Sequence, residues 1–223
     1  MRLRLQECTD QMFVFAVESL PIVSISLIFT SLMLVTEFSF HMKLVLRQDS
    51  LVPAFSTLLL IRELGPVLTG LLLASRVGAG MAAEIGTMRI TEQIDALKLF
   101  GVRPVEYLVL PRWIASVFAN VTLSIIALGV AIAGSSVMAA TTLGYNVDEY
   151  FLTLFSFTHF SDFVGCGIKA FVFGTIIPVV ASVHGLRCRM GSEGVGEAAT
   201  KSVVHSSMWI ITADFVLTYW LYR

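Results

Sequence analysis

The sequence is poor in charged residues, and this shortage excludes an ordinary soluble domain. Of its 223 residues only 14% are Asp, Glu, Lys or Arg, whereas 56% are hydrophobic and the mean hydropathy is +0.83. Soluble domains carry about 25% charged residues, and these cover much of their surface. A chain with so little charge is expected to face lipid, so we predict an integral membrane protein.

Cysteine and catalytic motifs are scarce as well. The three cysteines, Cys8, Cys166 and Cys188, are far apart and odd in number, which argues against a disulfide framework and leaves packing as their role. The chain has no GxxxxGK[ST] loop, no HExxH and no GxSxG, and its four histidines have no Cys or acidic neighbour at ligand spacing. We therefore expect this chain to carry no catalytic residue and to bind no metal or cofactor.

Long apolar runs are what the sequence has instead. A transmembrane helix needs about 20 mostly apolar residues, and about five segments meet this requirement. They cover residues 12–35, 50–75, 113–138, 163–186 and 202–222, and Pro21 is expected to kink the entry to the first. We predict an all-α membrane fold in one domain, 1–223. An outer loop is expected over 141–162 and a glycine-rich cytoplasmic loop over 191–202.

The distribution of Lys and Arg between the predicted spans indicates an orientation. The segments on the N-terminal side of the membrane hold ten of these residues, and the segments on the opposite side hold three. Short cytoplasmic loops are enriched in Lys and Arg. We therefore expect the N-terminus to lie in the cytoplasm and the C-terminus outside.

Small residues recur at every fourth position after the second predicted span begins. The stripe consists of Gly70, Ala74, Gly78, Ala82 and Gly86. Residues at this spacing share one face of a helix, and a smooth face lets another helix approach closely in a membrane. The pattern fits packing within one chain and a homodimer seam equally well.

The stretch 87–100, TMRITEQIDALKLF, predicts a charged, amphipathic helix over about 87–99 that cannot span a membrane. Thr91 is expected to cap a helix start that Glu92 and Asp95 complement electrostatically. Its apolar side would consist of Ile90, Ile94, Leu97 and Phe100. A plain interfacial helix is one interpretation. A docking helix for a cytoplasmic partner better explains why the polar residues Glu92, Gln93 and Asp95 occur among its apolar residues.

Four ionisable residues lie within the predicted spans, where charge is costly and usually functional. Arg62 and Glu63 are adjacent near the middle of the second span. Neighbouring side chains point about 100° apart on a helix, so each is expected to find a partner on another helix. Lys169 and Asp214 are predicted to pair and to line a polar pocket that opens outward, with Asp162 as a competing partner. The alternative is a buried ion pair that only fixes helix register.

Several of these segments together resemble the MlaE-type permease family, the membrane subunits of MCE (Mla-like) ABC transporters. The main match is LIRELGPVLTGLLLASRVGAGMAAEIGTMRITEQIDAL over residues 60–97. Further matches are LPRW at 110–113, CGIKAFVFG at 166–174 and VVHSSMWIITADFVLT at 203–218. The similarity covers about residues 15–220.

The resemblance implies a function and a set of partners. The family moves phospholipid between the two membranes of diderm bacteria or of the chloroplast envelope. A member of this kind would work as a homodimer in the inner membrane beneath MCE-domain subunits, with a small STAS-type regulatory subunit as a further candidate partner and with no nucleic acid. ATP and Mg would be bound by a separate ABC ATPase.

By the same resemblance, two groups of residues receive roles. Thr91, Glu92, Gln93 and Asp95 would belong to the coupling helix that docks on the ATPase, and Arg62, Glu63, Lys169 and Asp214 would line the lipid cavity. Two alternatives remain at this point. An ABC permease for a non-lipid hydrophobic solute would share every feature except the character of the cavity. A membrane-embedded lipid-modifying enzyme would need clustered catalytic groups, which the sequence lacks.

Overall fold

The computed structural model describes residues 5–45, 51–142 and 144–223, and the regular structure in these ranges is helical, without a strand. The helices are α1 (Leu5–Ala16), α2 (Leu20–Val45), α3 (Val52–Leu59), α4 (Gly65–Leu73), α5 (Ala79–Ile90), α6 (Gln93–Leu99), α7 (Leu110–Thr142), α8 (Val147–Phe157), α9 (Phe160–Leu186) and α10 (Ser192–Leu221). The π-helical turns η1 (Leu60–Leu64), η2 (Ala74–Gly78) and η3 (Val105–Val109) connect some of them.

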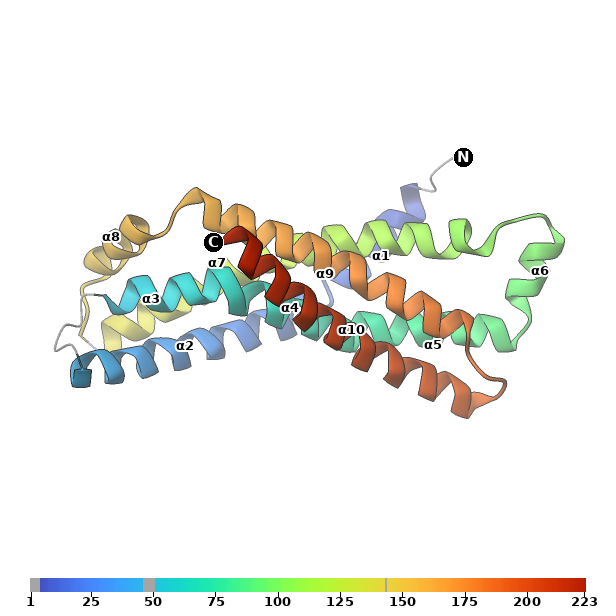
Figure 1. Ribbon diagram of the computed structural model, residues 1–223, viewed down its shortest axis with the longest axis horizontal. Helices are drawn as coiled ribbons and strands as arrows, with labels where there is room; N and C mark the ends of the chain where they lie inside the picture. Colours follow the sequence, from blue (N-terminus) through green and yellow to red (C-terminus); the bar gives the residue numbers. More distant parts are fainter. Residues whose placement is uncertain (1–4, 46–50, 143) are drawn as a thin grey trace.

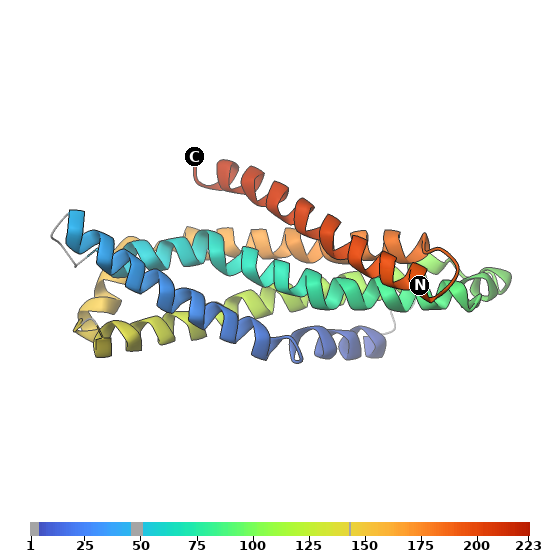
Figure 2. The ribbon, with the colours of Figure 1, turned by 90° about the horizontal axis from the view of Figure 1, so that it is seen from below.

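The long helices form one elongated bundle. Figure 1 shows α2, α7, α9 and the run from α3 to α5 along the long axis, with α8 at one end and α6 at the other. Helix α10 crosses the bundle obliquely, as Figure 2 also shows, and packs on α9 and α5. The α6 end therefore carries the short charged helix, and the α8 end carries the helix that follows α7.

The predicted membrane fold is confirmed. Four helical runs are long and apolar enough to cross a bilayer, namely Cys8–Leu44, Val52–Ile90, Val105–Thr141 and Phe160–Leu186. They contain four of the five predicted spans. Helix α10 contains the fifth, but its lower hydropathy leaves it outside this set, so the total of about five spans stays a prediction.

The first run is bent where Pro21 disturbs the backbone. Residues 17–19 form a turn between α1 and α2, and Pro21 is the second residue of α2. Proline has no N–H to offer the carbonyl four residues earlier, which is that of Val17, and its ring crowds that carbonyl. The break lets α1 depart from the direction of α2 and pack on α7.

The second run is longer than the sequence suggested. The prediction ended this span at residue 75, whereas Val52–Ile90 is helical over 39 residues. At about 1.5 Å per residue such a run measures about 58 Å, against a hydrocarbon thickness of about 30 Å. The charges in this added part have partners, since Arg76 pairs with Glu18 and Glu84 Oε1 pairs with Arg112 Nη2 at 2.7 Å. The run is thus longer than the hydrocarbon region requires.

The segment 141–162, expected to be an outer loop, is not a plain loop, because half of it is helix α8. Asn146 accepts a hydrogen bond from the backbone N–H of Asp148 and caps the helix. Tyr150 and Leu154 are buried in a cluster with Val52 of α3, Val35 of α2 and Ala139 of α7, and the Tyr150 hydroxyl lies 3.1 Å from Ser135 Oγ. The opposite side of α8 exposes Leu152 and Phe155.

The glycine-rich segment over 191–202 is also helical rather than a loop, because α10 begins at Ser192. Gly191 adopts φ 103° just before the helix, a conformation that favours glycine. Gly194 is needed for a different reason: a Cβ there would collide with the carbonyl oxygen of Arg189. These glycines make a tight entry to α10, so their number did not indicate a loop.

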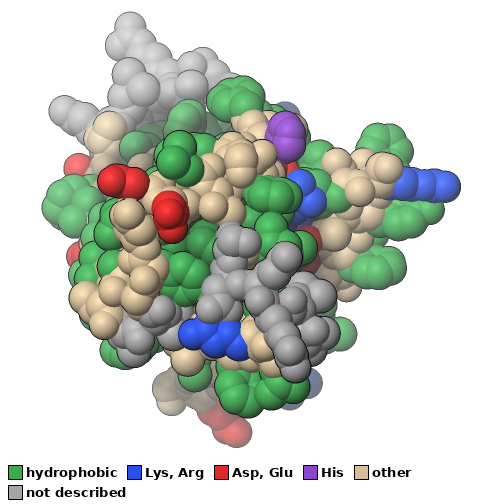
Figure 3. Space-filling model, turned by 90° about the vertical axis from the view of Figure 1, so that its left-hand side faces the viewer, with side chains coloured by type: hydrophobic (Ala, Val, Ile, Leu, Met, Phe, Trp, Pro, Cys, Tyr) green, Lys and Arg blue, Asp and Glu red, His purple; other side chains and the backbone are tan. Residues whose placement is uncertain are grey.

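The bundle is apolar outside and tightly packed inside, as lipid requires. Exposed aromatic and aliphatic side chains, among them Phe29, Met33 and Phe215, occur along the long helices. Figure 3 shows the α8 end, where hydrophobic side chains also cover much of the surface. Inside, α7 and α9 approach closely: a Cβ on Gly174 would lie 2.8 Å from Val117 Cα, and Asn120 Nδ2 donates to the Ala170 carbonyl at 2.7 Å.

Candidate functional site

The centre of the site is Lys169 of α9, whose side chain has an exposed fraction of 0%. Its ammonium donates hydrogen bonds to Glu63 Oε2 at 2.9 Å and to Thr218 Oγ1 at 2.6 Å. It donates a third to the backbone carbonyl of Arg62 at 2.7 Å. An ammonium has three N–H groups, and these three partners use all of them.

Asp214 of α10 is a fourth neighbour of the same ammonium. Its Oδ1 lies 2.8 Å from Lys169 Nζ, close enough for an ion pair. The same Oδ1 receives no aligned hydrogen bond from the described residues. This is expected when the three ammonium protons already point at other acceptors. The attraction between Lys169 and Asp214 is thus mainly between charges.

The local backbone explains why the Arg62 carbonyl is available. Arg62 and Glu63 belong to η1, and Pro66 follows in the first turn of α4. In an α-helix the backbone N–H of residue 66 would donate to the Arg62 carbonyl. Residue 66 is proline, which has no N–H, so this carbonyl lacks its usual donor. Lys169 supplies a hydrogen bond to this oxygen. Such π-helical turns inside helices often occur at functional sites.

The Arg62 side chain turns away from Lys169 and binds elsewhere. Its Nε donates to Asp162 Oδ1 at 2.8 Å, and its guanidinium carbon lies 4.6 Å from the centre of the Tyr222 ring. Asp162 is held in place because its other oxygen accepts the backbone N–H of His159 in a capping box at the start of α9. The network therefore ties η1, α9 and α10 together.

The network has more acid than base and is open on one side. Two cations, Arg62 and Lys169, face three carboxylates, Glu63, Asp162 and Asp214. Lys169 and Asp162 are closed off, whereas the Arg62 side chain is 36% exposed and that of Glu63 is 27% exposed. Arg62 and Glu63 thus form the edge at which something outside this chain can touch the network.

All four cavity residues predicted from the sequence lie together in this network. Lys169 and Asp214 are paired as expected, Asp162 pairs with Arg62 rather than with Lys169, and Arg62 and Glu63 use partners on other helices. The role of the network in lining a lipid cavity stays a prediction. The sequence reasoning missed Thr218 and Tyr222. The signal was present, because both follow Asp214 at spacings of four and eight on one helix face.

The predicted coupling helix is divided in two. Residues 87–90 complete α5, and α6 starts at Gln93 after a break at Thr91 and Glu92. Thr91 does not cap α6 but donates its hydroxyl to the Thr87 carbonyl at 2.9 Å. Glu92 precedes α6 with φ 57°, unusual for a residue with a side chain.

Helix α6 has a buried side and an exposed tip. Ile94 is buried against Ile85 and Leu108. At the other extreme, Leu99 is 90% exposed and Phe100 is 84% exposed. Phe100 therefore lies outside the apolar side to which the sequence assigned it. On the polar side the Lys98 ammonium donates to Asp95 at 2.6 Å and lowers the pKa of that carboxyl.

The stripe of small residues lies against helices of the same chain. A Cβ on Gly70 would lie 3.1 Å from Phe173, and one on Gly78 would lie 3.3 Å from Ile177, both in α9. Ala74 and Ala82 are fully buried, and Gly86 faces Cys188. All five positions therefore have close neighbours within this chain.

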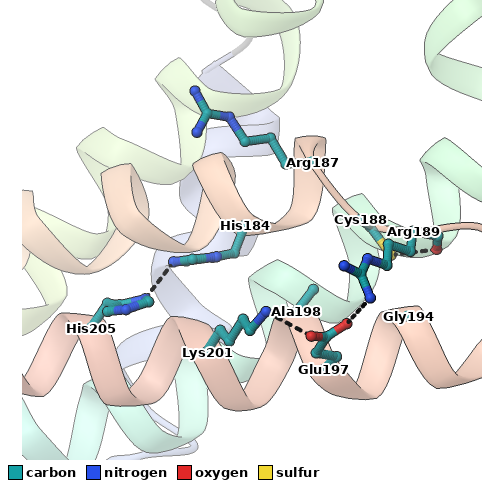
Figure 4. A pocket seen from close by; sticks show the side chains of 9 residues that line it. All are labelled: His184, Arg187, Cys188, Arg189, Gly194, Glu197, Ala198, Lys201 and His205. Carbon is teal, nitrogen blue, oxygen red and sulfur yellow. Dashed lines mark hydrogen bonds and ion pairs between the residues drawn. The ribbon is translucent and has the colours of Figure 1, made fainter.

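A polar pocket of about 250 Å³ lies between the end of α9 and the start of α10 (Figure 4). Here His184 Nε2 and His205 Nδ1 are 2.8 Å apart, with ring planes 13° from parallel. The contact requires one nitrogen to donate and the other to accept, so the two facing nitrogens share one proton. Nearby, Glu197 accepts from Lys201 at 2.6 Å, which lowers the pKa of Glu197. Nothing in the sequence pattern indicated that these two histidines are in contact.

A helical bundle of membrane-crossing length, with an ionic network inside it and a short helix projecting at one end, defines a polytopic membrane protein of the transport class. The chain belongs to the MlaE permease family, because the family model described as permease MlaE matches residues 8–220. This family confirms the resemblance seen in the sequence.

Individual relatives agree with the family. The chain is 34% identical to a probable ABC transporter permease protein of Rickettsia typhi, over 96% of this chain and 82% of the relative. It is 32% identical to the intermembrane phospholipid transport system permease protein MlaE of Haemophilus influenzae, over 93% and 80%. It is 37% identical to the chloroplastic protein TRIGALACTOSYLDIACYLGLYCEROL 1 of Arabidopsis thaliana, over 73% and 46%. The chain is thus an ABC transporter permease of a family associated with lipid transport.

Proposed function

We propose that this chain is the membrane subunit of an ABC transporter that moves phospholipid between an inner and an outer membrane. ATP would be hydrolysed by a separate ATPase subunit, and two copies of this chain would form the membrane unit beneath MCE-domain subunits. The membrane would be the inner membrane of a diderm bacterium, or alternatively the inner envelope of a chloroplast. Family membership supports the transport class.

The observation that carries the lipid assignment is the open edge of the ionic network. Arg62 and Glu63 present a guanidinium and a carboxylate at a partly exposed position inside a bundle whose outer surface is apolar. A phospholipid offers both a charged head group and acyl chains to such an edge. An apolar solute without charge would leave the edge without a partner, so the non-lipid alternative is less well supported.

Helix α6 supports the proposed coupling to an ATPase. It lies at the end of the bundle opposite α8, and its tip exposes Leu99 and Phe100 (Figure 1). Exposed apolar side chains beyond the membrane are characteristic of protein contacts. Glu92, Gln93 and Asp95 would supply the polar contacts around them.

The coupling proposal can be tested by co-purifying this chain with its proposed ABC ATPase subunit. Glu92→Lys reverses a charge at the start of α6 and should weaken the complex and its ATPase activity at least tenfold. Glu149→Lys makes the same change on α8, at the opposite end, and should leave both unaltered. An intact complex with Glu92→Lys would refute the assignment of α6.

The lipid proposal has its own test, because it does not depend on the ATPase. Mass spectrometry of molecules that co-purify with the chain should show phospholipid, and Glu63→Gln should reduce its amount. Enrichment of a non-lipid hydrophobic compound instead would favour the alternative permease.

A further inference from the structure

Two adjoining cavities lie beneath α1 at the α6 end of the bundle. The first, of about 290 Å³, is lined by Gln11, Met88, Tyr107, Leu108, Pro111 and Arg112, and we call it the Arg112 cavity. The second, of about 300 Å³, is lined by residues that include Gln11, Val14, Phe15, Val77, Gly80 and Glu84, and we call it the Gly80 cavity. Gln11 of α1 borders both. The Arg112–Glu84 ion pair connects them.

The Arg112 side chain has an unused donor. The residue is only 5% exposed, and its Nη2 binds Glu84 Oε1 at 2.7 Å. Its Nη1 is buried and has no hydrogen-bond acceptor among the described residues. A buried guanidinium nitrogen without an acceptor is costly. An oxygen anion entering the Arg112 cavity would give this nitrogen the acceptor that the described part of the chain does not provide.

The walls of the two cavities indicate what kind of molecule carries that anion. In the Gly80 cavity Val14, Phe15, Val77 and Met81 are apolar, and the charged Arg76 and Glu84 at its wall are paired with Glu18 and Arg112. Met12 and Phe13, next along α1, are exposed and apolar, so this edge of α1 is suited to lipid. A free inorganic anion would not use such walls, whereas an acyl chain would.

We propose that these cavities form a phospholipid site, separate from the ionic network, in which Arg112 binds the phosphate and the Gly80 cavity holds an acyl chain beside α1. The lipid would come from the cytoplasmic leaflet, a placement that rests on the orientation in the proposed function. The site is separate from the network around Lys169, because Arg112 and Glu84 lie nearer the α6 end of the bundle.

The site also adjoins the residues on which α6 packs. Met88, Tyr107 and Leu108 line the Arg112 cavity and also pack in the cluster that buries Ile94 of α6. A lipid in the cavity would pack against Met88, Tyr107 and Leu108 and so hold this cluster in place. Its occupancy would therefore stabilise the position of α6.

The test is thermal unfolding of the purified full-length chain in detergent with a short-chain phospholipid, dihexanoyl phosphatidylglycerol, below its micellar concentration. Gly80 has open space where a Cβ would be, so Gly80→Leu should fill the cavity without disturbing the helix. Gly129 of α7 has open space too, and Gly129→Leu is the matched control. The phospholipid should raise the Tm of the original chain and of Gly129→Leu, and the rise should fall at least twofold in Gly80→Leu.

Two further probes separate the phosphate from the acyl chain. Dioctanoylglycerol, which has no phosphate, and inorganic phosphate alone should each raise the Tm less than the phospholipid does. Arg112→Lys should remove the advantage of the phospholipid over dioctanoylglycerol. Equal increases in all variants, or an equal increase with either probe, would overturn the proposal. This readout needs neither ATPase nor transport, so its failure is distinguishable from failure of the proposed function.

Discussion

Lys169 on α9 donates a hydrogen bond of 2.7 Å to the backbone carbonyl of Arg62 on η1, where Pro66 withholds the usual helical donor. A side chain thereby completes the backbone hydrogen bonding of another helix. In the hydrocarbon region an unpaired carbonyl costs several kcal/mol, roughly as much as a lost buried hydrogen bond. Any movement of α9 against η1 must break this bond and the ionic contacts around it together.

The first prediction ranks substitutions in the network. Lys169→Met removes the ammonium that contacts Glu63, Thr218 and Asp214 and leaves the two carboxylates without their cation. Breaking a buried pair in this way costs roughly 3–5 kcal/mol. Asp214→Asn should cost clearly less, because Asp214 Oδ1 receives no aligned hydrogen bond within the described chain. Unfolding in detergent measures both, and a greater loss with Asp214→Asn would contradict this geometry.

The second prediction separates the two roles of Asp162. Its carboxylate pairs with Arg62 and also accepts the backbone N–H of His159. Asp162→Asn keeps an oxygen for His159 but loses the contact with Arg62, because its charge is gone and its NH2 group then faces the Arg62 Nε–H. Asp162→Ala loses the contacts with both Arg62 and His159. This variant should be less stable than Asp162→Asn by about 1 kcal/mol, the usual cost of a lost helix cap. If Asn and Ala are equally destabilising in the same unfolding assay, the capping contact has no energetic role.

The third prediction concerns the contact between α7 and α9. Gly174→Ala places a Cβ 2.8 Å from the backbone of Val117, which cannot move aside without moving its helix. We expect a loss of roughly 1–3 kcal/mol, as for overpacked cores. Gly167→Ala on the same helix has open space at its Cβ and is the matched control. A gain of up to about 1 kcal/mol is expected for this control from improved helix propensity, measured by its Tm.

The fourth prediction separates folding from partner binding at Glu92. Its φ of 57° is easier for glycine, so Glu92→Gly should leave the isolated chain as stable or up to about 1 kcal/mol more stable. The same change removes a proposed contact with the ATPase and should weaken the complex. Stability of the chain and affinity for the ATPase are measured separately. Unchanged affinity would mean that Glu92 is exposed without contacting the partner.

The sequence predicted the charges of the site better than the ends of the helices. Intramembrane charges such as Lys169 and Asp214 are so costly that they must pair, and helix geometry left few partners at the right depth. Arg76, by contrast, was taken as the end of a membrane span. A charge need not end a helix, because Arg76 pairs with Glu18 and the helical run continues to Ile90.

Two further differences between the predicted and the observed structure arose because one sequence feature is compatible with two structures. The acids Asp148 and Glu149 and the lack of Lys and Arg suggested an outer loop, yet they also suit the first turn of α8, where acids stabilise the helix dipole. The glycines of 191–202 suggested a loop, yet the close contact between Gly194 in the first turn of α10 and Arg189 just before that helix also requires glycine. In each case local composition fitted two structures, and tertiary packing decided between them.

The most direct test of the account is phospholipid transfer by the reconstituted complex. Proteoliposomes containing this chain and its ATPase would carry fluorescent phospholipid, with acceptor vesicles and the MCE-domain subunits supplied outside. The account predicts that transfer requires ATP hydrolysis. It also predicts that the transfer rate per folded protein falls at least tenfold with Lys169→Met. Transfer at the same rate with a non-hydrolysable ATP analogue, or no phospholipid transfer with a fully folded and active ATPase complex, would contradict it.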